Sequence, residues 1–297
     1  MTSPRIGVVG IPGKWSTEVL ADALEARTGF RQVIDMGTVV ADLTGPALFC
    51  DGTELNTLDA IVVKKISGEY SAHTLDRLEL LRLLERQGVR VFSPAESMLR
   101  LIDRLSCTVT LRNAEIPMPE TLITECTDQA LAAVRAFGSA VFKPLYSTKA
   151  RGMRLLSADE AKAKLKKHIA DFHRDNPVMY IQRKLELSGR DLGLVYLGGQ
   201  YLGAYARVAG GSAWDTTIHS GGKYAPFDAG PELIELGRRA QAPFGLDFTT
   251  VDIAETGSGP VVFEVSAFGG FRGAREGAGI DAAGAYADYV LKKVAGP

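Results

Sequence analysis

Short apolar runs alternate with amphipathic helical segments through the first third of the chain. The run Arg5–Val9 ends in a glycine-rich turn, and apolar residues at helical spacing follow it across Ser16–Arg27. Ala60–Val63 reads as a buried strand, and His73–Arg86 reads as a helix with leucines along one face. Strands that alternate with helices are typical of an open α/β sheet. We therefore predict a small α/β domain over residues 1–95.

The pattern changes after this domain. Apolar spacing predicts one uninterrupted helix over Ala95–Asn113, and short strands then mix with helices. In that part Ser157 reads as the N-cap of a basic helix that runs to Arg174. Strands predominate in the remainder, where Phe268–Gly279 reads as a loop. We expect two α+β lobes after the first domain, over residues 96–187 and 188–297.

The composition is that of an ordinary globular protein. The chain has 297 residues, of which 46% are hydrophobic, and 34 basic against 35 acidic residues give a net charge of −1. This balance excludes a molecule-wide basic field for nucleic acids or anionic membranes. The three cysteines, with no CxxC spacing, favour a reducing compartment. We expect a cytoplasmic protein without a nucleic-acid or membrane partner, and homo-oligomerisation stays open.

A lysine at the end of an apolar strand is the first candidate for chemistry. Lys143 closes the strand Ser139–Pro144, and a compact ammonium at the edge of a cleft suits a phosphate group. Taken alone, a lysine that only extends to solvent is the favoured interpretation. The following loop carries Ser147, Lys149 and Arg151, which could close over a triphosphate. A solvated basic loop explains those residues equally well.

Two acidic residues on neighbouring apolar strands are the second candidate. Asp252 and Glu264 are separated by a glycine-containing turn, so an antiparallel hairpin could bring them to one face. Two carboxylates side by side repel each other unless a cation lies between them. Magnesium bound to substrate phosphates usually takes one or two protein carboxylates. The alternative is that each acid pairs with an arginine.

Together these segments resemble the RimK-type amino-acid ligases of the ATP-grasp superfamily. The resemblance covers roughly residues 90–297, and it depends on eight motifs in the expected order rather than on any one of them. The motifs are Ile102-Asp103-Arg104, Ile116–Thr121, Val141–Pro144, Ile181–Leu185, Gly189-Arg190-Asp191, Arg207 with Thr217 and Gly221-Gly222, Asp252-Ile253 with Glu264-Val265-Ser266, and Gly279–Gly284.

The resemblance implies a fold and a nucleotide site. The fold is of mixed α/β and α+β class: an ATP-grasp fold, in which two α+β lobes clasp ATP, preceded by a small open α/β domain. The implied cofactors are ATP and Mg2+, with Mn2+ as an alternative metal. Asp252, Glu264 and Ser266 would hold the metal, and Arg207 and Lys143 would act in catalysis. The residues implied to contact ATP are Arg104, Lys143, Ser147, Lys149, Arg151, Gln182, Arg183, Leu185, Glu186 and Asp191.

The implied substrates are an anionic carboxylic acid and an amine acceptor. The acid would be a small molecule or a carboxylate of a peptide or protein, and the residues expected to contact it are Thr217, Gly222, Lys223, Arg272 and Arg275. A solvated group of basic residues that pair with Glu276 and Asp281 explains the same arginines equally well. For His219, a loop hydrogen bond is favoured over a general-base role.

Several positions depart from the family pattern. Ser266 and Thr217 each stand where the family has asparagine, Gly193 where it has arginine, and Arg183 where it has glutamate. The glycine-rich lid of the family is replaced by the side chains of residues 147–152. We therefore keep three hypotheses. The first is an ATP-dependent carboxylate–amine ligase that works through an acyl phosphate. The others are an ATP-grasp kinase for a small molecule and a non-catalytic nucleotide-binding protein.

Overall fold

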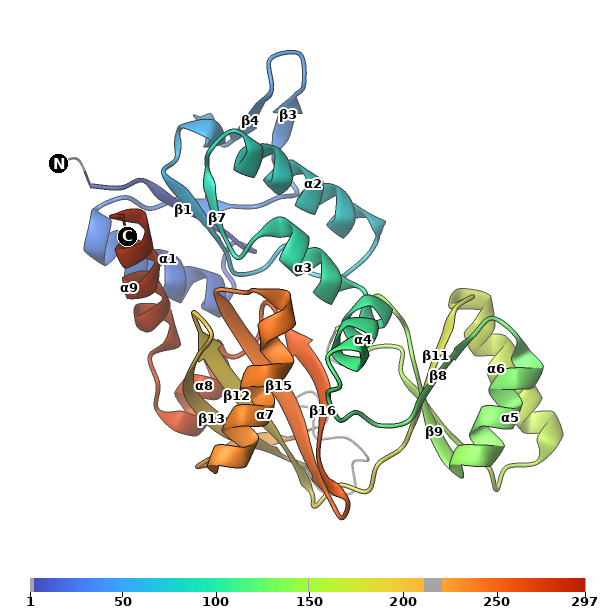
Figure 1. Cartoon of the computed structure of the whole chain (residues 1–297). Helices are drawn as coiled ribbons and strands as arrows, with labels where there is room; N and C mark the ends of the chain where they lie inside the picture. Colours follow the sequence, from blue (N-terminus) through green and yellow to red (C-terminus); the bar gives the residue numbers. More distant parts are fainter. Residues whose placement is uncertain (1–2, 149, 211–220, 297) are drawn as a thin grey trace.

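The computed structural model describes residues 3–148, 150–210 and 221–296 (Figure 1). Its first sheet is parallel, with the strand order β2-β1-β6-β7. The strands are β1 (Ile6–Val9), β2 (Val33–Ile34), β6 (Ala60–Val63) and β7 (Arg90–Phe92). β1 and β6 are buried along their whole length, because helices cover both faces of this sheet.

Alternate residues of these strands face different helices. Val8 and Val62 pack with the leucines of α1 (Trp15–Thr28), whereas Val9 and Val63 pack with those of α2 (Ala72–Arg86). A small antiparallel sheet, consisting of β3 (Val40–Asp42), β4 (Ala47–Cys50) and β5 (Thr53–Glu54), extends from this domain, and the 3-10 turn η1 (Leu55–Thr57) follows it.

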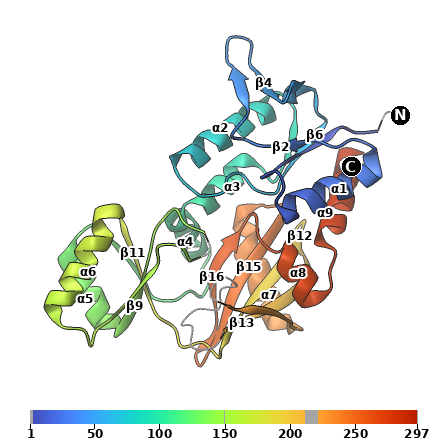
Figure 2. The same cartoon turned by 180° about the vertical axis from the view of Figure 1, so that it is seen from behind.

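The second sheet is antiparallel and belongs to a separate lobe. Its strand order is β10-β9-β11-β8, from β8 (Thr121–Thr124), β9 (Ser139–Lys143), β10 (Arg154–Ser157) and β11 (Met179–Arg183). The helices α5 (Thr127–Phe137) and α6 (Lys162–Asp175) pack on its outer face, as both views show (Figure 2). Their buried side chains form a core cluster of their own.

The third sheet has five antiparallel strands in the order β14-β13-β12-β15-β16. They are β12 (Arg190–Leu197), β13 (Gln200–Val208), β14 (Lys223–Pro226), β15 (Phe248–Thr256) and β16 (Gly259–Ser266). One face packs against α7 (Pro231–Gln241) and the 3-10 turn η3 (Ala242–Phe244), and the other packs against α8 (Phe271–Ala278). The last helix, α9 (Ala282–Val294), returns to α1, where Arg27 pairs with Asp288 at 2.6 Å.

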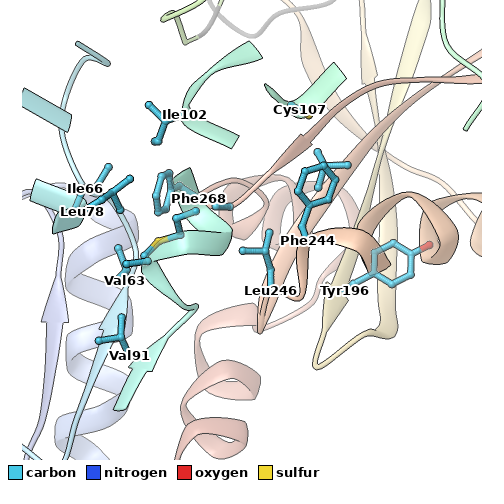
Figure 3. Packing of buried hydrophobic residues seen from close by; sticks show 14 of the residues in the cluster. Val63, Ile66, Leu78, Val91, Ile102, Cys107, Tyr196, Phe244, Leu246 and Phe268 are labelled. Atoms are coloured by element: carbon cyan, nitrogen blue, oxygen red, sulfur yellow. The ribbon is translucent and has the colours of Figure 1, made fainter. Parts of the chain in front are cut away.

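One continuous core joins the first domain to the third sheet. Val63 and Leu78 of the first domain belong to the same buried cluster as Leu246 and Phe268 (Figure 3). The connecting helices α3 (Ala95–Ile102) and α4 (Arg104–Asn113) contribute Ile102 and Cys107 to it (Figure 3). The lobe that carries β9 has a core cluster of its own, and the hydroxyls of Thr108 on α4 and Tyr180 on β11 lie 2.9 Å apart where this lobe meets the rest of the chain.

Three expectations about local structure were wrong. The helix predicted over Ala95–Asn113 is two helices, because Asp103 is extended and caps α4 by accepting from the amide of Leu105. The basic helix begins at Lys162 rather than at Ser157, which ends β10. The segment expected as a loop contains α8, whose Phe271 and Ala274 pack on the third sheet.

The proposed boundaries at residues 95 and 187 remain predictions, although each of the three large sheets lies inside one predicted range. In the part of the chain that the structure describes, no helix is both long and apolar enough to cross a membrane.

Candidate functional site

A cavity of about 900 Å³ lies where the three parts of the molecule meet. The first domain contributes Lys64 and Tyr70 to its wall, the second lobe contributes Lys143, and the third sheet contributes Asp252 and Glu264. A pocket of this size is large enough for a nucleotide and part of a second substrate. The structure therefore brings the lysine-bearing strand and the acidic hairpin to one cleft.

Lys143 ends β9 and points into this cavity. Its ammonium donates to Oε1 of Gln182 on the neighbouring strand at 2.6 Å and lies 5.5 Å from the ring of Phe263. The pKa of Lys143 falls from 10.5 to about 7, chiefly because of burial; Arg104 contributes to the decrease and Glu264 opposes it. A buried amine with this pKa is a strong site for an anion, because the anion restores the charged form.

Arg104 begins α4 and connects three segments around Lys143. Its guanidinium donates to Oε2 of Glu264 at 3.2 Å, to Oγ of Ser147 at 3.3 Å and to the carbonyl of Pro144 at 3.3 Å. The side chain is only 9% exposed, so this fork is held in one orientation. Two cations thus stand on one wall of the cavity, facing the acidic hairpin.

The acids Asp252 and Glu264 are direct cross-strand partners on β15 and β16. Asp252 receives the guanidinium of Arg207 at 3.0 Å, and Arg207 is also bound in a fork by the buried Asp191. Burial raises the pKa of Asp252 to about 7; Arg207 opposes this effect, and Asp191 and Glu264 reinforce it. Burial alone would lower the pKa of Arg207, but Asp252 and Asp191 raise it well above its ordinary value.

At the next pair on the same face of the hairpin, two residues with hydroxyl side chains line the same cavity. Thr250 on β15 is the cross-strand partner of Ser266 on β16, so both hydroxyls share a face with the acids. Sequence reasoning included Ser266 and missed Thr250. Thr250 and Asp252 are two residues apart, so the sequence already places both side chains on one face of a strand. Only the pairing of β15 with β16 shows that Glu264 and Ser266 share this face.

Lys64 is a second buried lysine of the cavity wall that sequence reasoning missed. It follows β6, donates to the carbonyl of Phe268 at 2.5 Å and lies 4.3 Å from the ring centre of Phe271. Burial lowers its pKa to about 7, and the neighbouring Lys65 adds to the effect. A lysine directly after a buried apolar strand is the same signal that identified Lys143.

Most of the predicted site residues line the cavity. They are Arg104, Lys143, Ser147, Arg151, Gln182, Arg183, Leu185, Asp191, Arg207, Asp252, Glu264, Ser266 and Arg272. Arg151 pairs with Glu69 of the first domain at 2.5 Å, which brings the loop after β9 across the cleft. Arg183 pairs with Glu120 at 2.6 Å.

Other predicted residues lie elsewhere. Glu186 is 90% exposed and pairs with Lys184 at 3.0 Å, and it does not line the cavity. Gly222 and Lys223 are likewise absent from its wall, and Arg275 lines a neighbouring hollow of about 350 Å³. Lys149, Thr217 and His219 lie outside the described residues.

Within the described ranges, no group of three His, Cys, Asp or Glu side chains could hold a metal by itself. A magnesium ion at this hairpin would therefore combine the two carboxylates with phosphate oxygens, hydroxyl groups and water.

The three-part architecture with its central cleft is that of an ATP-grasp protein. The ATP-grasp ligase PsnB in complex with a minimal precursor superposes with a TM-score of 0.76 and 20% identity, over 98% of this chain and 99% of that chain. A RimK domain protein from Sphaerobacter thermophilus superposes with a TM-score of 0.74 and 24% identity, over 96% and 98%. The expected fold class is confirmed.

The chain belongs to the RimK-like ATP-grasp family, whose model matches residues 102–290. A tetrahydromethanopterin:alpha-L-glutamate ligase from Methanosarcina acetivorans is 25% identical over 266 residues, which is 84% of this chain and 82% of that protein. A probable alpha-L-glutamate ligase from Stutzerimonas stutzeri is 27% identical over 290 residues, which is 96% and 94%. The predicted family, of ATP-dependent ligases that join carboxylates to amines, is thereby confirmed.

Proposed function

We propose that this protein is an ATP-dependent carboxylate–amine ligase that works through an acyl phosphate. The observation that carries the proposal is the meeting of Lys143 and Arg104 with Asp252 and Glu264 in one cavity. The cations suit the phosphates of ATP, and the carboxylates beside them suit its magnesium ion. The family's ligases use ATP and Mg2+, and PsnB has also been solved with Mg and ADP.

The residues present fit Mg-ATP. Without nucleotide, Asp252 is neutralised by Arg207 and Glu264 by Arg104, which are the charges that a divalent ion would replace. Lys143, with a pKa of about 7, has an amide oxygen rather than a carboxylate as its hydrogen-bond partner. The cavity wall therefore offers cations for the phosphates of Mg-ATP and carboxylates for its metal ion. We infer that Gln182, Arg183 and Leu185 lie along the nucleotide, whereas exposed Glu186 requires a side-chain movement to reach it.

The chain's own residues supply positioning and charge rather than a covalent nucleophile. When bound, Mg-ATP supplies the phosphoryl group that activates the substrate carboxylate. Lys143 and Arg104 would hold phosphate oxygens, and Arg207, which pairs with Asp252, would offer donors to the oxyanion that develops on the substrate. Arg151 of the loop after β9 pairs with Glu69 of the first domain, and this exposed pair would hold the loop near bound nucleotide.

The acid substrate is proposed to be anionic, as a small molecule or as a peptide or protein carboxylate. Arg272 and Lys64 both line the cavity and add positive charge to its wall, although Arg272 also pairs with Glu276 at 3.6 Å, as the alternative interpretation expected. The relatives named above are glutamate ligases, and PsnB was solved with a precursor peptide, so glutamate is the first amine to test as acceptor. Lys223 and Arg275 stay predictions for the outer part of this site.

The test is a partial-reaction assay that separates the three hypotheses. The protein is incubated with Mg-ATP and a panel of polycarboxylates or acidic peptides, first without and then with glutamate. A ligase releases ADP and phosphate together with an amide when both substrates are present, and Asp252→Asn abolishes the reaction. A stable phosphate ester would identify a kinase. Tight binding of ATP without turnover of any pair would identify a non-catalytic nucleotide-binding protein.

A further inference from the structure

A second, smaller hollow lies beside the main cavity. It has a volume of about 350 Å³, and the apolar part of its wall consists of Trp15, Val19, Phe271, Ile280, Ala282 and Ala283. Trp15 and Phe271 also line the main cavity, so the two spaces share a wall. The helices around the hollow support one another, because α9 packs against both α1 and α8 (Figure 2). A space at the lower end of the range for small-molecule pockets suits one side chain of a ligand.

Two arginines meet Trp15 at the boundary between the spaces. Arg272 and Arg275 are three residues apart on α8, which places them on one side of the helix. Their guanidinium carbons lie 5.5 Å and 5.6 Å from the centre of the Trp15 ring. Arg272 lines the main cavity, whereas Arg275 lines the hollow. The boundary between the two spaces is therefore cationic.

The positive charge at this boundary is available to a ligand. Arg275 is exposed and forms no ion pair with any of the residues that the structure describes. Arg272 pairs with Glu276 at 3.6 Å, but both side chains are more than half exposed, so the pair is weak. A guanidinium group binds a carboxylate well, because it offers N–H donors in parallel. The boundary therefore suits a carboxylate.

The hollow itself favours an uncharged side chain. Its wall includes Asp281, whose carboxylate caps α9 by accepting from the amide of Gly284 at 3.0 Å. This charge would repel an acidic side chain, and the apolar wall would deprive such a side chain of its hydration. An apolar side chain instead gains free energy when it leaves water there. The hollow thus differs in chemistry from a site for glutamate.

We propose that the hollow binds the apolar side chain of an α-amino acid, the amine acceptor of the ligase, whose carboxylate lies at Arg272 and Arg275. The amine of this acceptor faces the main cavity, where the activated carboxylate is expected. The inference rests on the proposed function and names the class of acceptor. The relatives described above are glutamate ligases. Here the α-carboxylate occupies the arginines, which leaves Asp281 as the other charged residue in the wall of the hollow.

The fluorescence of Trp15 can report on this site, because the sequence contains only one other tryptophan, Trp214. A Trp214→Phe variant with bound Mg-ADP is titrated with leucine, valine, phenylalanine and glutamate. We expect saturable binding of at least one apolar amino acid, about tenfold or more tighter than that of glutamate. The amino alcohol of the tightest ligand lacks the carboxylate and should bind about tenfold or more weakly. Equilibrium dialysis of the labelled ligands with the wild type should give the same order of affinities.

Three further variants locate the site. Arg275→Met removes one guanidinium group and should weaken binding of the amino acid about tenfold or more. Val19→Phe fills the hollow and should have a similar effect, but Mg-ADP binding should not change, because Val19 lies outside the main cavity. Arg239→Met removes an exposed arginine of α7 that lines neither space, and both affinities should stay unchanged. Urea denaturation checks that each variant folds.

The outcomes separate this inference from the proposed function. A wild-type protein that binds no Mg-ADP overturns the proposed function and the inference with it. If Mg-ADP binds but none of the apolar amino acids does, or if glutamate binds more tightly than all of them, the inference fails alone. It also fails if the folded Arg275→Met variant keeps the wild-type affinity for the amino acid, because the ligand then lies elsewhere.

Discussion

Lys143 is predicted to take up a proton when the nucleotide binds. Its pKa in the ligand-free protein is about 7, so at pH 8 about nine-tenths of it is neutral. A phosphate beside the amine restores the charged form, and binding must then draw a proton from the solvent. The difference in proton uptake between the wild type and Lys143→Met is therefore about 0.9 at pH 8 and only about 0.1 at pH 6.

Calorimetry with preformed Mg-ADP measures this difference. The apparent binding enthalpy is determined in several buffers of different ionisation enthalpy, and its slope gives the number of protons exchanged. Preforming the complex keeps the nucleotide's own protons out of the comparison. Lys223→Met, which removes an exposed lysine outside the cavity wall, serves as the matched control and should keep the wild-type slope. Equal slopes for the wild type and Lys143→Met at pH 8 would refute the reasoning.

The same substitution tests the cost of burying this amine. A pKa that falls from 10.5 to about 7 means that the charged form destabilises the fold at pH 7, by roughly 4 kcal/mol as an upper limit. The lost bond to Gln182 and relaxation of the site reduce the net gain, so Lys143→Met should raise the unfolding free energy by about 1–3 kcal/mol. The gain shrinks as pH rises toward 10.5, because the wild-type amine is then neutral in both states. Urea denaturation in ligand-free buffer measures it, and a less stable variant would contradict the assignment.

Three further predictions concern other parts of the structure. Lys64→Met should flatten the rise in unfolding free energy between pH 7 and pH 9, because Lys64 has a folded pKa of about 7 and the unfolded chain binds more protons in that interval; urea denaturation at several pH values checks it. Gly273→Ala should destabilise the protein by about 1–3 kcal/mol in the same assay, since the added Cβ would lie 2.2 Å from the buried ring of Tyr205. Arg151→Ala should change the unfolding free energy by less than about 1 kcal/mol, because its pair with Glu69 is solvent-exposed, but it should raise the KM for ATP if the loop closes over the nucleotide.

The residues of the site that the local pattern could predict, Lys143, Asp252 and Glu264, lie on apolar strands. Arg104, which begins α4, was assigned only through the family resemblance. Lys143 follows four residues of β9 whose short apolar run, closed by Pro144, indicates a buried strand, so the local pattern predicted its place at the strand end. Asp252 and Glu264 interrupt apolar strands in the same way, and the turn between them indicated a hairpin. The order of the eight family motifs along the chain then indicated that these strands contribute to one site.

The missed features depend on tertiary contacts. α8 contains Gly273 and Gly277, which lower helix propensity, and it forms because their missing side chains let the helix lie against Tyr205. The break at Asp103 has no Gly or Pro signal and appears only when Arg104 turns toward Glu264. The ion pairs of Arg207 depend on which residues face each other across β12, β13 and β15, and no single segment contains that information.

The charges of the ligand-free cleft explain why its cations and acids can share one cavity. Arg207 neutralises Asp252 and Arg104 neutralises Glu264, so the acidic hairpin is not left with two opposed carboxylates. Among the described residues Lys143 has an amide and no carboxylate as its hydrogen-bond partner, and burial lowers its pKa to about 7. Mg-ADP would bring both kinds of counter-charge. Its metal ion would pair with Asp252 and Glu264, and its phosphates would pair with Lys143 and with the arginines that these acids no longer hold. Metal and nucleotide should therefore bind cooperatively. Asp252→Asn should remove the gain in ADP affinity that Mg2+ gives to the wild type, while ADP binding without Mg2+ stays nearly unchanged. If ADP binds equally tightly with and without Mg2+, this account of the cleft is wrong.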